Sequence, residues 1–335
     1  MSTIYLGSKQ YKINTGLVLT GSYKTVICDG RIVYKGEDVA FTVKNAYRCK
    51  TLINTIDASN GTALKLDATE GAVVSNDFTI NIIRNCNIGI HLYTNGSHVS
   101  HNTLRNTYMS AKDTAIKVWA DSYYINENLW YLDWINGEWQ YGIYLHSDAA
   151  LDNTPGFGVN DNKFYSGSLE GNNKNSIPLL IDRSYGNYFK ELRLAEGYGA
   201  TSVKMRGKCN RNDISLNHLV LSEVDISELE AGSVHNVLRC RGSHSDTTNY
   251  FIVGDEIRVS AAHGFTYIPD RYNYNINITA NTFAENIITH VGTVIPTALT
   301  FDDSDINGLT FIVDGIYSDH GSMTRGFPLT VRFGE

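Results

Sequence analysis

The chain has 335 residues, a net charge of −7 and 42% hydrophobic residues, so it is long enough to bury a large core. It lacks a basic stripe that could neutralise phosphates, which argues against nucleic acid, and no apolar run is long enough for membrane insertion. The 29 Gly, together with abundant Asn, Tyr, Ile, Thr and Val, are typical of strands and turns. We therefore expect an all-β protein, and we recognise no secretory signal at its start.

Two series of residues recur through the middle of the chain with the same period. The first is an Asn followed after one residue by an apolar residue, at spacings of 26, 26, 34, 25 and 25: Asn76, Asn102, Asn128, Asn162, Asn187 and Asn212. The second is a short alternating strand that starts at Ala63, Gly89, Ala115, Gly142, Pro178 and Ser202. Both series break once at the same place, which locates one insertion within residues 146–158.

A repeat of this length with three short strands is typical of one turn of a parallel β-coil, in which each strand pairs with its counterpart one turn later. The six-residue period of left-handed coils is absent, so we predict a right-handed, single-stranded parallel β-helix over residues 41–243. Residues 1–40 are expected to form a β-rich capping or attachment segment, since an open sheet edge invites aggregation. Residues 244–335 have a different strand spacing and predict a C-terminal antiparallel β domain. The Asn are expected at corners, with positive φ and a ladder of hydrogen bonds.

Side-chain alternation predicts which residues of the second series face outward. Ile90 and Leu92, with their equivalents on later turns, are expected to point into the core. One outward column is His91, Lys117, Tyr144, Leu180 and Lys204, and the other is Tyr93, Trp119, His146, Asp182 and Arg206. Sugar rings stack on indole and phenol rings, and their hydroxyls bond to carboxylates and amides, so the second column suits a glycan. A subunit interface favours the same residue types and is an equal alternative.

All four Trp lie within a short stretch: Trp119, Trp130, Trp134 and Trp139. Trp130 follows a corner Asn and is expected inside, which leaves three indoles around one outward patch with Asp133 and Glu138. Farther on, the repeat would stack three carboxylates on successive turns: Glu170, Glu196 and Glu223. Carboxylates about 5 Å apart suit the acid and base roles of glycoside hydrolysis. Solvated turn residues are the alternative explanation.

The sequence offers no metal or cofactor motif. Its five Cys are scattered and fit reduced thiols in a core: Cys28, Cys49, Cys86, Cys209 and Cys240. An Asp ladder for Ca²⁺, a zinc motif and a phosphate-binding loop are all absent, so no cofactor is expected. A lyase would instead need a basic or phenolic side chain as its base. The residues available for that role are Tyr144, His146, Arg183, Lys204 and Arg206.

Through these Asn corners and alternating strands, over about residues 40–242, the chain resembles the β-helical tailspike and tail-fibre proteins of bacteriophages, within the pectate-lyase-like superfamily. The resemblance is architectural, because no catalytic motif matches residue for residue. It implies a homotrimer of side-by-side β-helices, attached to the virion by other phage tail proteins and present in the host cytoplasm before assembly. It also implies recognition, and in many members cleavage, of a host cell-surface polysaccharide.

We therefore predict a tailspike-like protein that binds capsule or O-antigen, with depolymerisation left open. The residues expected to bind the glycan are Tyr93, Trp119, Trp134, Trp139, Tyr144, His146, Arg183 and Arg206. The acid and base candidates are Asp133, Glu138, Glu170 and Asp182. A glycoside hydrolase is the favoured activity, and a polysaccharide lyase is the weaker one. The second hypothesis is a non-enzymatic tail or baseplate component whose aromatic patch is buried between subunits.

Overall fold

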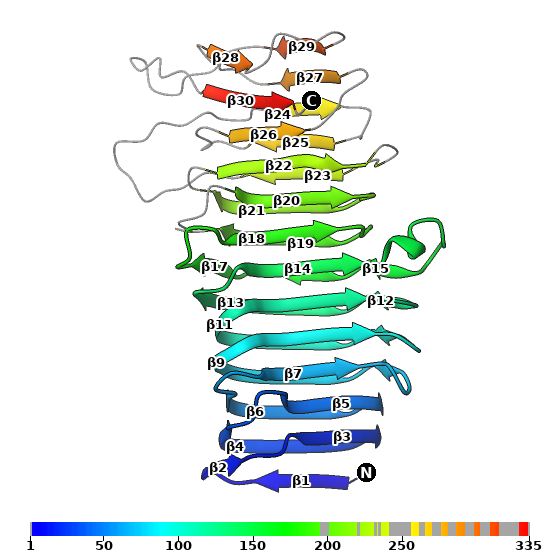
Figure 1. The fold of residues 1–335 in the computed structure, drawn as a ribbon, viewed down its shortest axis with the longest axis vertical. Helices are drawn as coiled ribbons and strands as arrows, with labels where there is room; N and C mark the ends of the chain where they lie inside the picture. Colours follow the sequence, from blue (N-terminus) through cyan, green and yellow to red (C-terminus); the bar gives the residue numbers. More distant parts are fainter. Residues whose placement is uncertain are drawn as a thin grey trace.

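The computed structural model describes residues 2–194, 201–219, 222–230, 233 and 236–240, and after these the strands from β24 onward. The chain is wound into a tall stack of turns, with the first strand at one end (Figure 1). Between residues 2 and 240, the described strand pairings are all parallel. The described part contains a single short helix, η1 (Ala149–Leu151), which lies within the predicted insertion. The predicted all-β parallel β-helix is thus confirmed as a parallel β-solenoid.

Each full turn contributes strands to three faces. The Trp119 face contains β3 (Leu17–Ser22), β5 (Val39–Tyr47), β7 (Thr62–Asp67), the second halves of β9 (Asp77–Thr94) and β11 (Thr103–Ala120), β14 (Tyr141–Ser147), β18 (Ile177–Asp182), β20 (Thr201–Gly207) and β22 (Ser222–Leu229). The Trp134 face contains β1 (Ser2–Leu6), β2 (Gln10–Ile13), β4 (Lys24–Tyr34), β6 (Lys50–Asp57), the first halves of β9 and β11, β13 (Leu129–Gly137), β16 (Lys163–Tyr165), β17 (Ser168–Gly171), β19 (Tyr188–Leu194), β21 (Asp213–Leu219) and β23 (Asn236–Cys240). The short face contains β8 (Val73–Val74), β10 (Val99–Ser100), β12 (Tyr124–Asn126) and β15 (Gly158–Asn160).

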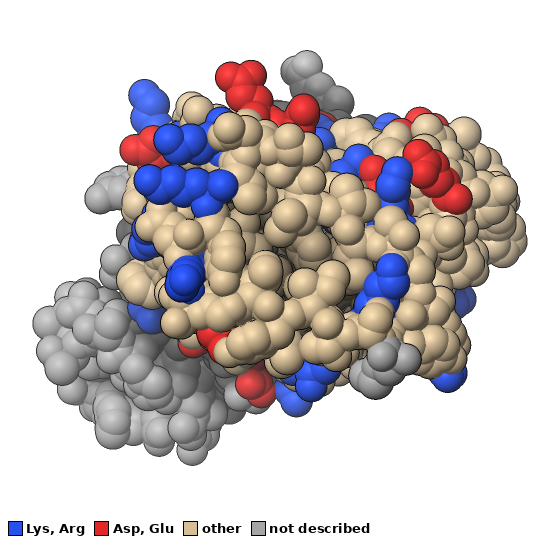
Figure 2. Space-filling view, turned by 90° about the horizontal axis from the view of Figure 1, so that it is seen from below, with Lys and Arg blue, Asp and Glu red and all other residues tan. Residues whose placement is uncertain are grey.

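The coil begins earlier than predicted, because residues 2–40 continue the stack. β1 pairs in parallel with β4, and β4 pairs with β6, so the segment expected to be a separate cap supplies complete turns. In these turns the corner Asn is missing. Cys49 occupies the position equivalent to Asn76, and its backbone N–H donates to Asn76 Oδ1 at 2.8 Å. Seen from the N-terminal end, charged side chains lie around the rim of the stack (Figure 2).

A ladder of buried Asn side chains runs along the corner between the short face and the Trp134 face. From Asn102 to Asn236, each Oδ1 accepts the Nδ2 of the preceding Asn at 2.9–3.2 Å and also accepts that residue's backbone N–H. The ladder was predicted, but the positive φ was not placed correctly. From Asn76 to Asn212 it falls on the residue before each Asn, as at His101 (φ 56°) and Glu127 (φ 55°), which turns the chain so that the amide faces inward.

The interior is filled by equivalent residues stacked turn upon turn. The inward residues of the second series are at most 2% exposed, as their alternation predicted. Trp130 is fully buried, as predicted, and its ring stacks on Phe164 with centroids 5.2 Å apart. Phe164 in turn stacks on Phe189 at 4.8 Å. The described thiols of Cys28, Cys49, Cys86 and Cys209 are free and buried in this core.

The C-terminal strands are β24 (Glu256–Ser260), β25 (Phe265–Pro269), β26 (Ile276–Ala280), β27 (Asn286–Val291), β28 (Ala298–Phe301), β29 (Leu309–Asp314) and β30 (Pro328–Phe333). β24 pairs with β27 in the antiparallel sense, whereas β26 pairs with β30 in parallel. A separate antiparallel domain at 244–335 stays a prediction.

Candidate functional site

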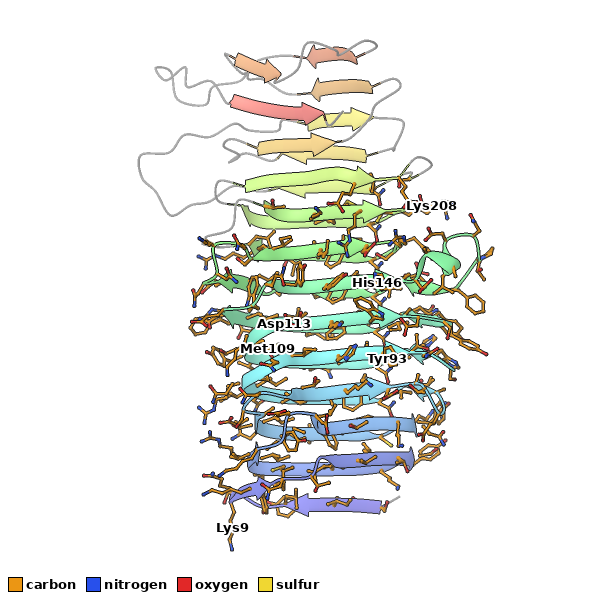
Figure 3. The ribbon with its side chains drawn as sticks, viewed as in Figure 1. Lys9, Tyr93, Met109, Asp113, His146 and Lys208 are labelled. Carbon is orange, nitrogen blue, oxygen red and sulfur yellow. The ribbon has the colours of Figure 1, made fainter. Side chains whose placement is uncertain are left out.

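The predicted outward columns exist on the Trp119 face. Trp119 on β11 lies opposite Tyr93 on β9 and His146 on β14, and the column continues through Asp182 to Arg206. Tyr93 and His146 lie on the same side of the stack (Figure 3). Parallel pairing brings residues that are far apart in the sequence within contact distance, about 4.8 Å per turn. We call Tyr93, Trp119, Asp121, Tyr144, His146, Asp182 and Arg206 the Trp119 cluster.

Trp119 is partly buried, and its ring is contacted by residues of its own turn and of the next turn. Its ring centroid lies 3.8 Å from that of His146 and 5.5 Å from that of Tyr144, and Lys117 Nζ lies 4.4 Å from it. Its Nε1–H donates to Asp121 Oδ1 at 2.7 Å. The Tyr93 hydroxyl donates to the other oxygen of Asp121, also at 2.7 Å. The indole is therefore a packed member of a polar network and offers little free ring surface to a sugar.

Asp121 was missed by the sequence analysis. It lies just beyond the end of β11, so strand alternation does not apply to it. The signal that could have found it is local, since it follows Trp119 by two residues and an outward indole N–H needs an acceptor.

Asp182 is the most connected residue of the cluster. Its carboxylate is 1% exposed and receives His146 Nδ1 at 2.8 Å, Arg206 Nε at 2.9 Å and Arg183 Nη1 at 3.1 Å. Burial opposes its ionisation, but the hydrogen bonds from His146 and Arg206, together with the charge of the guanidinium, outweigh burial and lower the pKa of Asp182. A carboxylate that is buried and held ionised cannot deliver a proton. Of the acid and base roles for which Asp182 was a candidate, its lowered pKa argues against the acid role, and its hydrogen bonds fix the positions of His146 and Arg206.

Tyr144 is unsuited to act as a base. It is 7% exposed, and its hydroxyl accepts a hydrogen bond from Arg206 Nη2 at 2.7 Å. Burial raises the pKa of Tyr144 to about 12 despite the nearby guanidinium, so it stays a phenol at neutral pH. As a phenol with a bound Arg, it can donate its proton to a ligand oxygen.

The neighbouring column places an imidazole between two ammonium groups. Lys65, His91 and Lys117 lie opposite one another on three successive turns. Burial, followed by the charges of Lys117 and Lys65, lowers the pKa of His91 to about 3. Burial likewise lowers the pKa of Lys117. His91 is therefore neutral at physiological pH.

The Trp134 face carries a second aromatic surface, which is open to solvent. Trp134 is 44% exposed and Tyr131 is 43% exposed. Trp134 Nε1–H donates to Glu170 Oε2 at 2.8 Å, and Ser168 Oγ donates to the other oxygen of Glu170 at 2.8 Å. Tyr131 stacks on Tyr165 with ring centroids 5.4 Å apart. We call Tyr131, Trp134, Tyr165 and Glu170 the Trp134 platform.

The structure separates the indoles that the sequence analysis placed in one patch. Trp119 and Trp134 lie on different faces, and Trp139 is fully buried. A Cβ at Gly171 would lie 2.8 Å from Trp139 Cη2, so this glycine makes room for the indole inside the coil. Trp139 has no accessible face, and its predicted role in substrate binding is wrong.

The predicted carboxylate ladder is also wrong. Glu170 lies on β17 of the Trp134 face, whereas Glu223 lies on β22, which pairs with β20 on the Trp119 face. Glu196 lies outside the described residues. Asp133 and Glu138 are exposed; Asp133 lies next to Trp134 on β13, and Glu138 follows the last residue of that strand. Of the predicted site residues, the Trp119 face thus brings together Tyr93, Trp119, Tyr144, His146, Asp182, Arg183 and Arg206.

In the described part of the chain, no group of three or more His, Cys, Asp or Glu is arranged to hold a metal ion. The helix found there is far too short to cross a bilayer. Comparison with protein-family models, curated proteins and solved structures gives no match.

Proposed function

We propose that this protein binds a bacterial surface polysaccharide, in the manner of a phage tailspike, and that the Trp134 platform is its main sugar contact. The observation that carries the proposal is the 44% exposure of Trp134 on a coil whose core already contains Trp130 and Trp139. One edge of the Trp134 ring packs against Tyr108 of the preceding turn, with centroids 5.2 Å apart, and much of the remaining ring surface is open to solvent. With its N–H fixed by Glu170, the indole presents a rigid apolar surface beside a carboxylate, the combination that a sugar ring needs.

Cleavage of the glycan is the second part of the proposal. The carboxylates that a substrate on the platform could reach are Glu170, Asp133 and Glu138, which makes them the acid and base candidates for a glycoside hydrolase. Glu170 has the best defined position, because both of its oxygens are already oriented by hydrogen bonds. The Trp119 cluster is the candidate for lyase chemistry, but its phenol is held protonated. Hydrolysis therefore remains the favoured activity.

The proposal includes the finer features expected from the resemblance: a right-handed coil, an antiparallel C-terminal domain, a homotrimer and attachment to the virion tail. The competing proposal is a structural tail component in which the same platform is buried between subunits. Exposed Trp and Tyr next to Arg105, whose guanidinium lies 5.3 Å from the Tyr131 ring, favour an interface as much as a glycan site.

Replacing Trp134 by alanine distinguishes the two proposals. Binding to a panel of capsular and O-antigen polysaccharides would be measured by titration calorimetry, and the oligomeric state by sedimentation. The matched control is Tyr123→Ala, since Tyr123 is 42% exposed but lies just before the short-face strand β12. We expect Trp134→Ala to weaken binding by about fivefold or more and to leave the oligomer intact. Dissociation of the oligomer by Trp134→Ala, with no glycan bound by the wild type, would support the structural component instead.

A further inference from the structure

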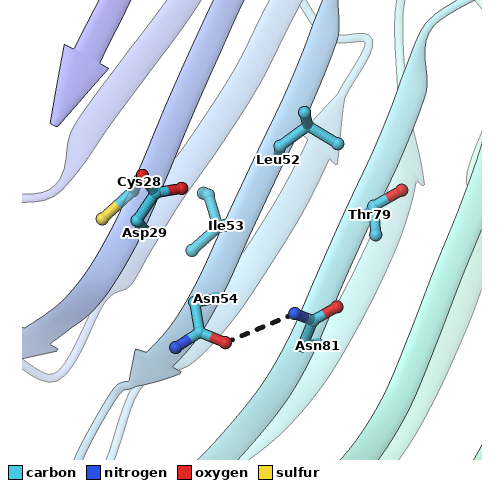
Figure 4. A pocket seen from close by; sticks show the side chains of 7 residues that line it. All are labelled: Cys28, Asp29, Leu52, Ile53, Asn54, Thr79 and Asn81. Carbon is cyan, nitrogen blue, oxygen red and sulfur yellow. Dashed lines mark hydrogen bonds between the residues drawn. The ribbon is translucent and has the colours of Figure 1, made fainter. Parts of the chain in front are cut away.

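Below the Trp134 platform, the same face of the coil is hollowed. A hollow of about 400 Å³ spans the three successive strands β4, β6 and β9. Its polar lining comes from Asp29, Asn54, Thr79 and Asn81, and Leu52 supplies an apolar patch (Figure 4). Asn54 and Asn81 are exposed and are linked by one hydrogen bond, from Asn81 Nδ2 to Asn54 Oδ1 at 3.3 Å.

The hollow and the platform belong to one column of the coil. The strand pairings place Asn54 opposite Asn81, Asn81 opposite Thr107, and Thr107 opposite Asp133. Asp133 directly precedes Trp134 in β13. From Asp29 to Asp133 the column crosses four steps between turns, or about 19 Å along the stack. A linear ligand on the platform that extended parallel to the stack axis would therefore enter the hollow.

The side chains of the column indicate which class of ligand it could bind. Amide, hydroxyl and carboxylate groups can pair with the hydroxyls of a sugar, both as donors and as acceptors. The lining of the hollow has an acid, Asp29, and no base, so an anionic chain would be disfavoured. At the far end Tyr5 is 63% exposed, and its hydroxyl donates to Asp29 Oδ2 at 2.6 Å. The column thus has an exposed aromatic ring at each end and hydrogen-bonding groups between them.

We infer that this column is an extended subsite for a neutral saccharide chain, which runs from Trp134 through Asn81 and Asn54 to Tyr5. The inference rests on the proposed glycan-binding function and adds to it the class of sugar and the direction of the chain. A purely structural amide pair would explain the bond between Asn54 and Asn81. It would not explain why that pair lines a hollow in the same column of the coil as Asp133, beside the platform.

The test compares two Asn of the same strand. Asn81→Ala removes an amide from the hollow. Asn87→Ala is the matched control, since Asn87 is also exposed on β9 and its Nδ2 also donates to the preceding turn, at the Asn60 carbonyl. The probes are graded length series of oligosaccharides, cut from a panel of neutral O-antigens and from uronate-containing capsules. Affinity is measured by calorimetry, and thermal unfolding checks that the variants are folded.

We expect wild-type affinity to rise with the length of the neutral oligosaccharides. In Asn81→Ala the shortest oligosaccharides should bind normally and the longer ones about fivefold more weakly, with Asn87→Ala like the wild type. If the affinity of Asn81→Ala rises with oligosaccharide length as much as that of the wild type, or if uronate chains bind better than neutral ones, this inference is overturned. The proposed binding at the Trp134 platform would not be affected by either result. Failure of the wild type to bind any of the probes would overturn the proposed function and this inference together.

Discussion

Asp182→Asn tests whether the Trp119 cluster is organised by one buried charge. Asparagine preserves the shape of the side chain but removes the negative charge, and it turns one acceptor oxygen into a donor that would face Arg206 or His146. Removing one partner of a buried ion pair typically costs about 3–5 kcal/mol. Since the Arg206 and Arg183 side chains are 33% and 27% exposed and can be partly rehydrated, we expect a loss near the lower figure, about 3 kcal/mol at pH 7.

The lowered pKa of Asp182 also predicts how the stability of the protein changes with pH. The pKa of Asp182 is lower in the folded protein than the value of about 3.9 in an unfolded chain. The unfolded state therefore takes up the proton first on acidification. The stability that ionised Asp182 contributes is present above about pH 4 and is lost as the pH falls through the folded pKa. Asp182→Asn lacks the titrating group, so the difference in the free energy of unfolding between the variant and the wild type should become smaller below pH 4.

Urea unfolding followed by Trp fluorescence, at pH 7 and again at pH 3, measures both effects. Asp133→Asn is the control, because that carboxylate is exposed and should change the free energy of unfolding by less than about 0.5 kcal/mol. The reasoning fails if Asp182→Asn costs less than 1 kcal/mol at pH 7, or if its deficit is the same at pH 3.

Two further predictions concern the coil. Asn128→Leu would leave the buried N–H and Nδ2 of Asn102 without their shared acceptor. It should lower the free energy of unfolding, measured with urea, by roughly 3–6 kcal/mol. A loss under 1 kcal/mol would show that the ladder does not stabilise the stack. His91 has a folded pKa of about 3 against about 6.5 when unfolded, so wild-type stability should fall by up to about 1.4 kcal/mol per pH unit between pH 6.5 and 3. His91→Gln should lose that component of the slope, and an unchanged slope would contradict the burial of a neutral imidazole.

The sequence predicted the features that depend only on the repeat. Once the period is known, alternation fixes Leu92, Val118 and Leu145 in one interior column, and the structure buries all three. The repeat also predicts that Trp119, His146 and Asp182 lie opposite one another on successive turns, as they do in the structure. These predictions hold because parallel pairing converts spacing along the chain into contact between turns.

The errors come from places where the backbone departs from regular alternation. At Asp133 and Trp134 two successive residues face outward, so counting by twos does not place Trp134. Gly137, with φ 135°, redirects the chain just before Trp139, and the indole enters a space that Gly171 leaves free. Neither departure follows from strand propensity, and the burial of Trp139 depends on Gly171 of the next turn.

The two aromatic surfaces differ in a way that composition could not reveal, and the difference is the reason for proposing the Trp134 platform as the sugar contact. In the Trp119 cluster the indole N–H, the phenol of Tyr144 and the carboxylate of Asp182 all have partners within the protein. A ligand would have to displace some of these bonds and would gain little net free energy from exchanging them. On the Trp134 platform the polar atom of the indole is bonded to Glu170, while the ring remains 44% exposed. Covering that ring releases water without breaking a protein hydrogen bond, so binding energy is available there. The same residue types thus stabilise the coil on one face and remain free to contact a ligand on the other.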